Sequence, residues 1–193
     1  MERKITIVSV LSNGLALGIK NAASLLGCIV LWALTCWIPY INIGTTIAMA
    51  CLPLEIAKGN IVSPLAIFDK KYFKYMGEYF LITAFTQMGV MVGMFLFIIP
   101  GIVISIAWSL GLLTMVDEGV SPLEALTASN KATMGYKWTI FLCNAILWIA
   151  VGIVASIFNL IPAVGWLFAF AVVVAAWAIM LGMKAHIYSK LSE

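Results

Sequence analysis

Three long stretches of the chain contain no charged residue and are rich in apolar side chains. They cover residues 21–54, 79–116 and 138–183. One helix needs only about 20 apolar residues to cross a bilayer, so each stretch is long enough for two crossings. Irregular backbone in a membrane is tolerated only where it is shielded or reaches the interface. A proline near the middle of each stretch therefore marks the end of one crossing: Pro39, Pro100 and Pro162.

The pattern predicts six membrane-spanning helices, at 20–38, 41–57, 78–99, 101–117, 138–161 and 163–183. Composition agrees, because hydrophobic residues form 64% of the chain and charged residues 10%, whereas a soluble domain has about 25% charged residues. This composition excludes a water-soluble globular protein. We predict an all-α integral membrane protein whose residues 1–193 form a single membrane domain.

Charged residues are distributed unevenly between the two ends of the predicted helices. If the six crossings are real, all eleven Lys and Arg residues and all eight Asp and Glu residues fall on one side. The ends on the opposite side carry no charge. Because Lys and Arg beside membrane-spanning helices are retained in the cytoplasm, the sequence predicts that the N- and C-termini are both cytoplasmic.

Parts of the sequence recur at a regular spacing. A Ser-Pro-Leu segment begins at Ser63 and again at Ser121, and each is closed by a Met-Gly pair, at Gly77 and Gly135. A weaker third copy ends at Gly18, and the three glycines are 59 and 58 residues apart. Fixed-period similarity indicates a repeated architecture. We predict three helical-hairpin repeats, each preceded by a cytoplasmic helix, at about 1–60, 61–119 and 120–193.

The segments before the second and third hairpins resemble short helices on the membrane surface. Ser63 and Ser121 fit as N-cap residues, each followed by proline at the first helical position, and Glu124 completes a capping box with Ser121. In the second unit an apolar stripe opposes a charged face, which is typical of an interfacial amphipathic helix. The stripe is Leu65, Phe68, Tyr72 and Tyr75, and the charged residues are Asp69, Lys70, Lys71 and Lys74.

The basic face is a candidate site for anionic lipid headgroups. Lys70, Lys71 and Lys74 are the predicted contacts, and each well-placed lysine contributes about 1 kcal/mol to such binding. The alternative is a solvated connector whose charges follow only from the topology. Membrane lipids are the expected partners, and a homo-oligomer is compatible with the sequence.

Polar residues inside the predicted helices are the second candidate site. Thr86 and Asn144 each lie nine residues beyond a repeat glycine, which at about 1.5 Å per residue places them near the bilayer centre. Gln87 follows Thr86, and Gly27 is the equivalent position in the first unit. If the hairpins surround a pseudo-threefold axis, Thr86, Gln87 and Asn144 line a pore or a substrate pocket. The alternative is that these side chains only hydrogen-bond between helices.

Chemical motifs are missing from the sequence. No ionisable residue lies deep in a predicted helix, so the usual marker of an ion path is absent. Lys184 and the sole histidine, His186, follow the last predicted crossing. The four cysteines are not at metal-ligand spacing, and no phosphate-binding loop or catalytic motif is present. We expect no enzyme activity, no metal or other cofactor, and no nucleic-acid partner.

One stretch of the sequence resembles known membrane proteins. It contains Pro100-Gly101, Glu118-Gly-Val-Ser-Pro-Leu-Glu-Ala-Leu126, Ser129 and Gly135-Tyr-Lys-Trp138. These elements resemble YciC-like bacterial inner-membrane proteins and the membrane domain attached to some glycerophosphodiester phosphodiesterases. The resemblance implies a multi-pass helical bundle in a bacterial inner membrane. No catalytic motif belongs to that membrane domain, so the resemblance implies no enzyme activity.

Two functional hypotheses follow from these observations. The leading one is a non-enzymatic membrane protein that translocates or binds a small or amphiphilic molecule within the helix bundle. The alternative is a structural or lipid-organising protein whose cytoplasmic amphipathic helices contact anionic lipid or a partner. The sequence leaves the identity of the ligand, the energy coupling and the oligomeric state open.

Overall fold

The computed structural model describes residues 5–161 and 164–192, and every regular element in these ranges is a helix. Six helical segments of this part are long and apolar enough to cross a membrane, which is the number that the sequence predicts. The predicted tip residue Pro162 lies outside the described residues. The six segments are α1 (Ile7–Thr35), α2 (Pro39–Ala57), α4 (Met76–Leu96), α5 with α6 (Ile98–Glu118), α8 (Lys137–Asn159) and α9 (Gly165–Leu191).

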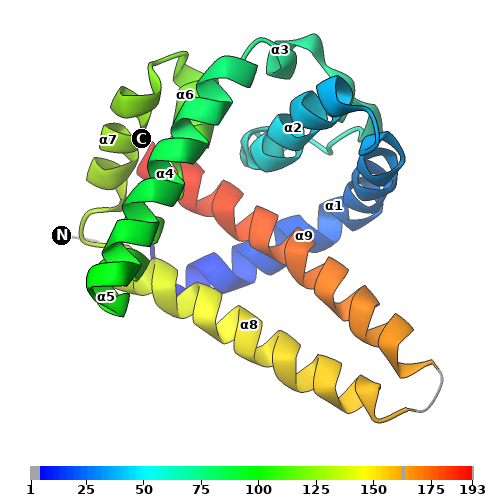
Figure 1. The fold of residues 1–193 in the computed structure, drawn as a ribbon. Coiled ribbons are helices and arrows are strands. Elements are labelled where there is room, and N and C mark those ends of the chain that lie inside the picture. The colour runs from blue at the N-terminus through cyan, green and yellow to red at the C-terminus, as the bar shows by residue number, and fades with distance from the viewer. Residues whose placement is uncertain (1–4, 162–163, 193) are drawn as a thin grey trace.

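The last helix, α9, packs against α1, α8 and α2 (Figure 1). Glycines make its crossing with α1. A Cβ atom added to Gly18 would lie 2.8 Å from the Cα atom of Ile179, and one added to Gly182 would overlap the carbonyl oxygen of Gly14. Small residues at a helix interface let the two backbones approach closely, so α1 and α9 are in direct backbone contact here.

The first hairpin differs from the predicted repeat. Instead of a separate cytoplasmic helix that ends at Gly18, α1 is one continuous helix from Ile7, and Gly18 lies inside it. Thr6 begins this helix with a capping box, because its hydroxyl accepts a hydrogen bond from the backbone N–H of Ser9. Gly18 allows α1 to cross α9 closely, and it does not end a helix. The first unit therefore lacks the layout that the repeat predicts.

The hairpin of α4 and α5 is also closely packed at glycines. A Cβ atom added to Gly93 would lie 2.8 Å from the Cα atom of Gly101, so the two backbones are close here, as small residues at a helix interface allow. The tip of the hairpin exposes large apolar side chains. Phe95 is 89% exposed and Phe97 is 75% exposed, as expected of residues that face lipid.

The fourth span is not a single helix, although 101–117 is predicted as one. Helix α5 (Ile98–Ala107) ends before a turn at residues 108–110, and α6 (Gly111–Glu118) begins after it. The short helix α7 (Pro122–Thr133) lies beside α6 (Figure 1). One face of α7 is buried against this region, and it consists of Ala125, Leu126, Ser129 and Thr133.

The predicted start of α7 is confirmed in detail. The Ser121 hydroxyl accepts a hydrogen bond from the backbone N–H of Glu124, and the Glu124 carboxylate accepts one from the backbone N–H of Ser121. The Glu124 carboxylate also accepts a hydrogen bond from the Ser121 hydroxyl at 2.8 Å. This bond and the one from the Ser121 backbone N–H hold the pKa of Glu124 below its ordinary value. Ser63 occupies the equivalent N-cap position before Pro64, but its side chain makes no capping hydrogen bond.

The predicted amphipathic helix of the second unit is replaced by two short elements. These are the 3-10 helix η1 (Pro64–Phe68) and α3 (Lys70–Phe73), with extended backbone at Asp69 between them. The Asp69 carboxylate accepts a hydrogen bond from the backbone N–H of Lys71, so it begins a new helix and interrupts the old one. Tyr72 is buried inside the protein, whereas Leu65 of the same predicted stripe is 68% exposed.

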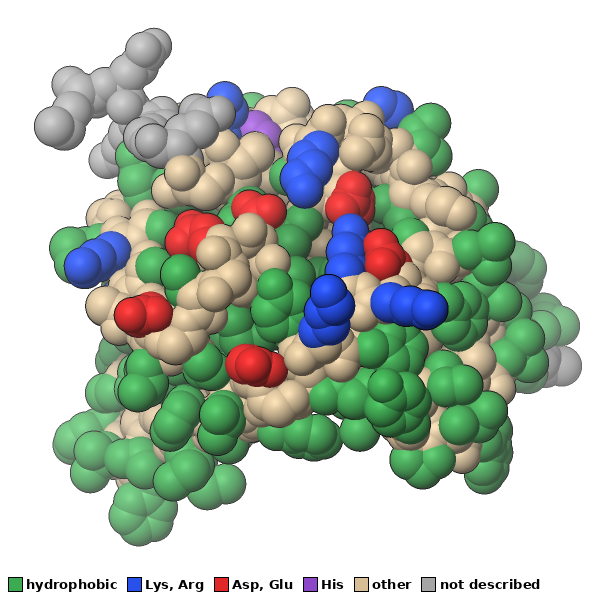
Figure 2. Space-filling model, turned by 90° about the horizontal axis from the view of Figure 1, so that it is seen from above, with side chains coloured by type: hydrophobic (Ala, Val, Ile, Leu, Met, Phe, Trp, Pro, Cys, Tyr) green, Lys and Arg blue, Asp and Glu red, His purple; other side chains and the backbone are tan. Residues whose placement is uncertain are grey.

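Charged side chains gather on one face of the molecule (Figure 2). The Lys71 ammonium group lies 3.0 Å from the Glu55 carboxylate, and the Lys58 ammonium group lies 3.9 Å from the Asp117 carboxylate. These pairs join the end of α2 to α3 and to the end of α6. Arg3 and Lys4, two of the basic residues predicted to lie on the cytoplasmic side, are outside the described residues.

Candidate functional site

A side chain from α7 holds the break in the fourth span. The hydroxyl of Ser129, which is fully buried, donates to the carbonyl oxygen of Ala107 at 2.6 Å and accepts from the backbone N–H of Leu110 at 3.2 Å. The hydroxyl of Thr133 lies 3.5 Å from the same Ala107 oxygen, but it donates at 2.9 Å to the carbonyl oxygen of Ser129 in its own helix. Unpaired backbone groups are costly inside a membrane. The inserted hydroxyl of Ser129 therefore allows the helix to stop and restart.

A cavity of about 390 Å³, with polar groups set in a mainly apolar wall, lies between α4 and the broken span. We call it the α4 cavity. Helix α4 contributes Thr83, Thr86 and Gln87 to its lining, and the fourth span contributes Ser105 and Ser109. Apolar residues of α2, α4 and α6 complete the wall. Polar groups of α4 and of the fourth span thus border one mainly apolar space, with Gln87 at its exposed edge. Such a combination is typical of small-molecule sites.

A second cavity, of about 140 Å³, also borders Ser105 and Ser109. We call it the α9 cavity, because Lys184 of α9 lines it together with Asn144 of α8. The two serines belong to both cavities. The polar groups of the two spaces therefore meet on one segment of the broken fourth span.

The predicted site residues lie in two neighbouring cavities and not in one axial pore. Thr86 and Gln87 line the α4 cavity, and Asn144 lines the α9 cavity. Gly27 lines neither cavity. It packs against Pro64, whose ring would lie 2.8 Å from a Cβ atom added to Gly27. The first unit does not contribute to a shared site in the way that the repeat suggests.

Three of the polar groups, those of Ser105, Ser109 and Asn144, use one hydrogen within their own helix and keep further capacity. The hydroxyls of Ser105 and Ser109 donate to the carbonyl oxygens of Ile102 and Ile106, both at 2.8 Å. The amide of Asn144 donates one hydrogen to a carbonyl oxygen of α8 at 3.0 Å. An asparagine amide has two hydrogens and a carbonyl oxygen. Asn144 therefore retains both a donor and an acceptor for a ligand.

Lys184 is a site residue that the sequence did not suggest. The predicted last crossing ends at residue 183, but α9 continues to Leu191, and Lys184 lies inside it and is partly buried. Within residues 5–161 and 164–192 its ammonium group makes no hydrogen bond and no ion pair. The signal in the sequence is that apolar residues continue beyond it, at Ala185 and Ile187, which are both buried.

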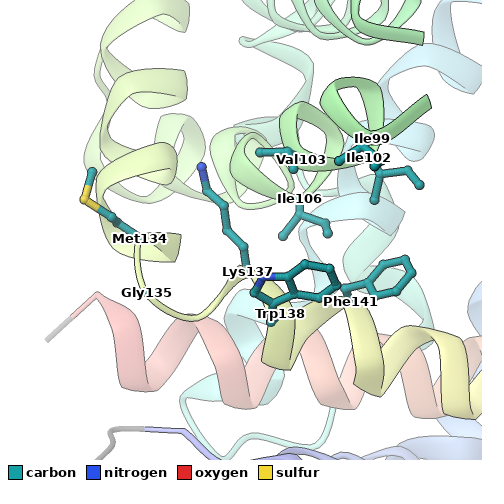
Figure 3. Close-up of a pocket in the computed structure, with 9 residues that line it drawn as sticks. All are labelled: Ile99, Ile102, Val103, Ile106, Met134, Gly135, Lys137, Trp138 and Phe141. Atoms are coloured by element: carbon teal, nitrogen blue, oxygen red, sulfur yellow. The ribbon is translucent and has the colours of Figure 1, made fainter. Parts of the chain in front are cut away.

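An apolar groove of about 480 Å³ lies between α5 and α8. Figure 3 shows the rings of Trp138 and Phe141 on α8 beside the isoleucines of α5, among them Ile102 and Ile106. Ile106 also lines the α9 cavity. The groove and the polar α9 cavity are therefore adjacent along α5.

The predicted lipid-contacting lysines are exposed, but they have different surroundings. Lys70 and Lys74 line a groove of about 440 Å³ together with three aromatic residues, Tyr40, Phe68 and Phe73. Lys71 is instead paired with Glu55 and Asp69, at 3.0 and 3.7 Å. Burial lowers the pKa of Lys71, but the hydrogen bond to the Glu55 carboxylate and the interactions with Tyr72 together outweigh this effect, so that the pKa of Lys71 is raised.

The described residues contain no group of three or more His, Cys, Asp or Glu side chains that could hold a metal ion. No protein-family model matches the chain, and no curated protein or solved structure matches it significantly. The class of the protein therefore rests on the fold itself. Six apolar helices of sufficient length define a multi-pass helical membrane protein.

Proposed function

We propose that this protein binds or translocates a small or amphiphilic molecule within its helix bundle, without catalysing a reaction on it. The observation that carries the proposal is the pair of polar cavities that share Ser105 and Ser109 at the break in the fourth span. Irregular backbone at membrane depth is tolerated only where it is buried in protein or lines a cavity. Thr86, Gln87 and Asn144 provide the polar contacts for the ligand.

The proposed location is a bacterial inner membrane, with both termini in the cytoplasm. The charged face in Figure 2 supports this orientation, because basic residues beside membrane-spanning helices remain in the cytoplasm. The resemblance to YciC-like proteins and to the membrane domain of glycerophosphodiester phosphodiesterases supports the bacterial assignment. We further propose that the second and third hairpins, each preceded by a Ser-Pro segment at Ser63 or Ser121, are diverged copies of one unit.

A flux assay tests the proposed function. Purified protein is placed in liposomes with a fluorescently labelled single-chain amphiphile, and its movement between leaflets is measured by quenching from outside. We expect the variant Gln87→Leu with Asn144→Leu to lose most of the flux. Ser156→Leu is the matched control, since Ser156 is a polar residue of α8 that is exposed and lines neither cavity. Unchanged flux in the double variant would remove these residues from the site.

A second candidate function, the organisation of anionic lipid, is favoured by the groove at Lys70 and Lys74. Two lysines beside three aromatic rings suit an anionic headgroup at the membrane interface. The test is the amount of anionic phospholipid that copurifies with the protein. Lys70→Met with Lys74→Met should reduce this amount, whereas Lys190→Met, which removes an exposed lysine of α9, should not.

A further inference from the structure

Lys184 presents its side-chain amine to the α9 cavity without an acidic partner. Its ammonium group makes no ion pair within the part of the chain that the structure describes. Its neighbours in the cavity wall are mainly apolar, among them Ile106, Ile140 and Ile187. A charge that is taken out of water without a partner is destabilising. An ionisable residue inside a membrane-spanning helix therefore indicates function.

The acid that reaches α9 near this position is already engaged. Asp117 accepts a hydrogen bond from the hydroxyl of Tyr188, one turn beyond Lys184, at 2.8 Å. The same carboxylate lies 3.9 Å from the ammonium group of Lys58. Its two partners hold Asp117 at the end of α6, so the structure leaves the charge of Lys184 for a ligand.

From this geometry we infer that the α9 cavity binds the anionic headgroup of a single-chain amphiphile, either a carboxylate or a phosphate monoester. The inference rests on the proposed function and names its ligand class. Lys184 supplies the opposite charge and three hydrogen-bond donors, and Asn144 supplies the amide hydrogen that it does not use within α8. The cavity of about 140 Å³ is much larger than one water requires.

The adjacent groove accommodates the alkyl chain. It is lined by Ile99, Ile102 and Val103 on α5 and by Trp138 and Phe141 on α8 (Figure 3). Because Ile106 borders both spaces, a headgroup at Lys184 places its chain along α5. Burial of each CH₂ group contributes about 0.8 kcal/mol. The combination of a cationic cavity and an apolar groove selects an amphiphile over a small free anion.

The groove contains a rival cation, Lys137. Its ammonium group donates to the side-chain oxygen of Asn130 at 2.9 Å, and Figure 3 shows its side chain extending away from the Trp138 and Phe141 rings. Since this lysine already has a hydrogen-bond partner and lies outside the α9 cavity, we assign the headgroup to Lys184. The experiment below includes both lysines.

The test measures equilibrium binding of two radiolabelled probes, dodecyl phosphate and uncharged dodecanol, to the full chain in nanodiscs of zwitterionic lipid. The wild type should bind dodecyl phosphate about tenfold more tightly than dodecanol, a difference of about 1.4 kcal/mol. Lys184→Met should reduce this preference to less than about twofold, and Lys184→Arg should retain most of it. Lys137→Met and Lys190→Met should leave it unchanged. Unlabelled inorganic phosphate should not compete for the site.

Each other outcome overturns a distinct claim. A charge preference that persists in Lys184→Met, or that disappears in Lys137→Met, removes the headgroup from Lys184. Strong competition by inorganic phosphate shows a site for a free anion and contradicts the amphiphile. If the wild type binds neither probe above the level of empty nanodiscs, the proposed function itself fails. Lys184→Arg shows whether lost binding reflects the charge or a failure to fold.

Discussion

The sixth span, α9, and the fourth span, α5 with α6, differ in the continuity of their backbone. Helix α9 is unbroken over 27 residues, and glycines bring it into backbone contact with α1. The fourth span has 21 residues, and its helix is interrupted by a turn at residues 108–110. There Ser129 of another helix supplies the hydrogen bonds that an intact helix would make for itself.

The two spans therefore have different roles: α9 belongs to the closely packed scaffold, and the fourth span borders the candidate site. Around α9 the small residues remove space between helices, and the backbone satisfies its own polar groups. Around the fourth span, by contrast, the α4 cavity, the α9 cavity and the apolar groove all border α5 or the break that follows it. The irregular span therefore provides both the space and the polar groups that a ligand requires, while α9 contributes one charged side chain from a fixed position.

The largest effect is expected at the crossing of α1 and α9. In Gly182→Ala the added Cβ atom overlaps the backbone of Gly14, so the helices must separate, at a cost of about 3 kcal/mol. The melting temperature of the purified protein should fall by about 5 °C or more. Gly152→Ala is the matched control, because an added Cβ atom there has no neighbour within 4 Å. Equal melting temperatures for the two variants would show that α9 is not the tightly packed scaffold.

A smaller loss is expected when the break in the fourth span loses its support. Ser129→Ala leaves the carbonyl oxygen of Ala107 and the N–H of Leu110 without their main partner, at a cost of about 2 kcal/mol. Amide hydrogen exchange at Leu110 should become faster. Thr127→Ala removes an exposed hydroxyl from the same helix and should change neither quantity. If Ser129→Ala is as stable as the wild type, the hydroxyl does not hold the break.

A third, weaker effect on stability is expected when the hydrogen bond between α9 and the fourth span is removed. Tyr188→Phe removes the hydrogen bond from α9 to the Asp117 carboxylate at the end of α6, which contributes about 1.5 kcal/mol. Lys58→Met removes only the exposed pair at 3.9 Å, worth about 0.5 kcal/mol or less. Thermal unfolding should rank the two variants in this order. The reverse ranking would mean that the spans are joined through α2 and not directly.

The smallest effect concerns the start of α7, and it depends on pH. The pKa of Glu124 is lower in the folded chain than in the unfolded chain, so its contribution to stability is present above the unfolded value and is lost as pH falls through the folded value. Below about pH 4 the wild type should lose slightly more stability than Glu124→Gln. Melting curves at two pH values measure this difference, and an equal loss in both proteins would exclude a role for the capping box.

The sequence predicted the six crossings because length and absence of charge are sufficient for a helix in a membrane. It did not predict the break at residues 108–110, since the segment from 101 to 116 contains neither proline nor charge. The cause is Ser129, a residue 19 positions beyond Leu110 that meets it only in the folded chain. Gly18 was misinterpreted for a related reason, because its partner is Ile179 on the last helix.

The candidate site was also predicted only in part. Thr86, Gln87 and Asn144 are polar residues within apolar helices, and that local signal identified them. Ser105 and Ser109 connect the two cavities only because the fourth span bends between α4 and α9. Lys184 was predicted to lie just outside the last crossing, since a lysine after a long apolar run usually flanks a membrane. Its place in a cavity depends on the continuation of α9, which tertiary packing determines.

The most direct test of the binding site is an experimental density map of the protein purified with dodecyl phosphate in nanodiscs. The account predicts non-protein density in the α9 cavity, with its headgroup within hydrogen-bond distance of Lys184 and Asn144 and its chain along α5. Density for the amphiphile only at other surfaces of the protein, with the α9 cavity closed by protein side chains, would contradict it.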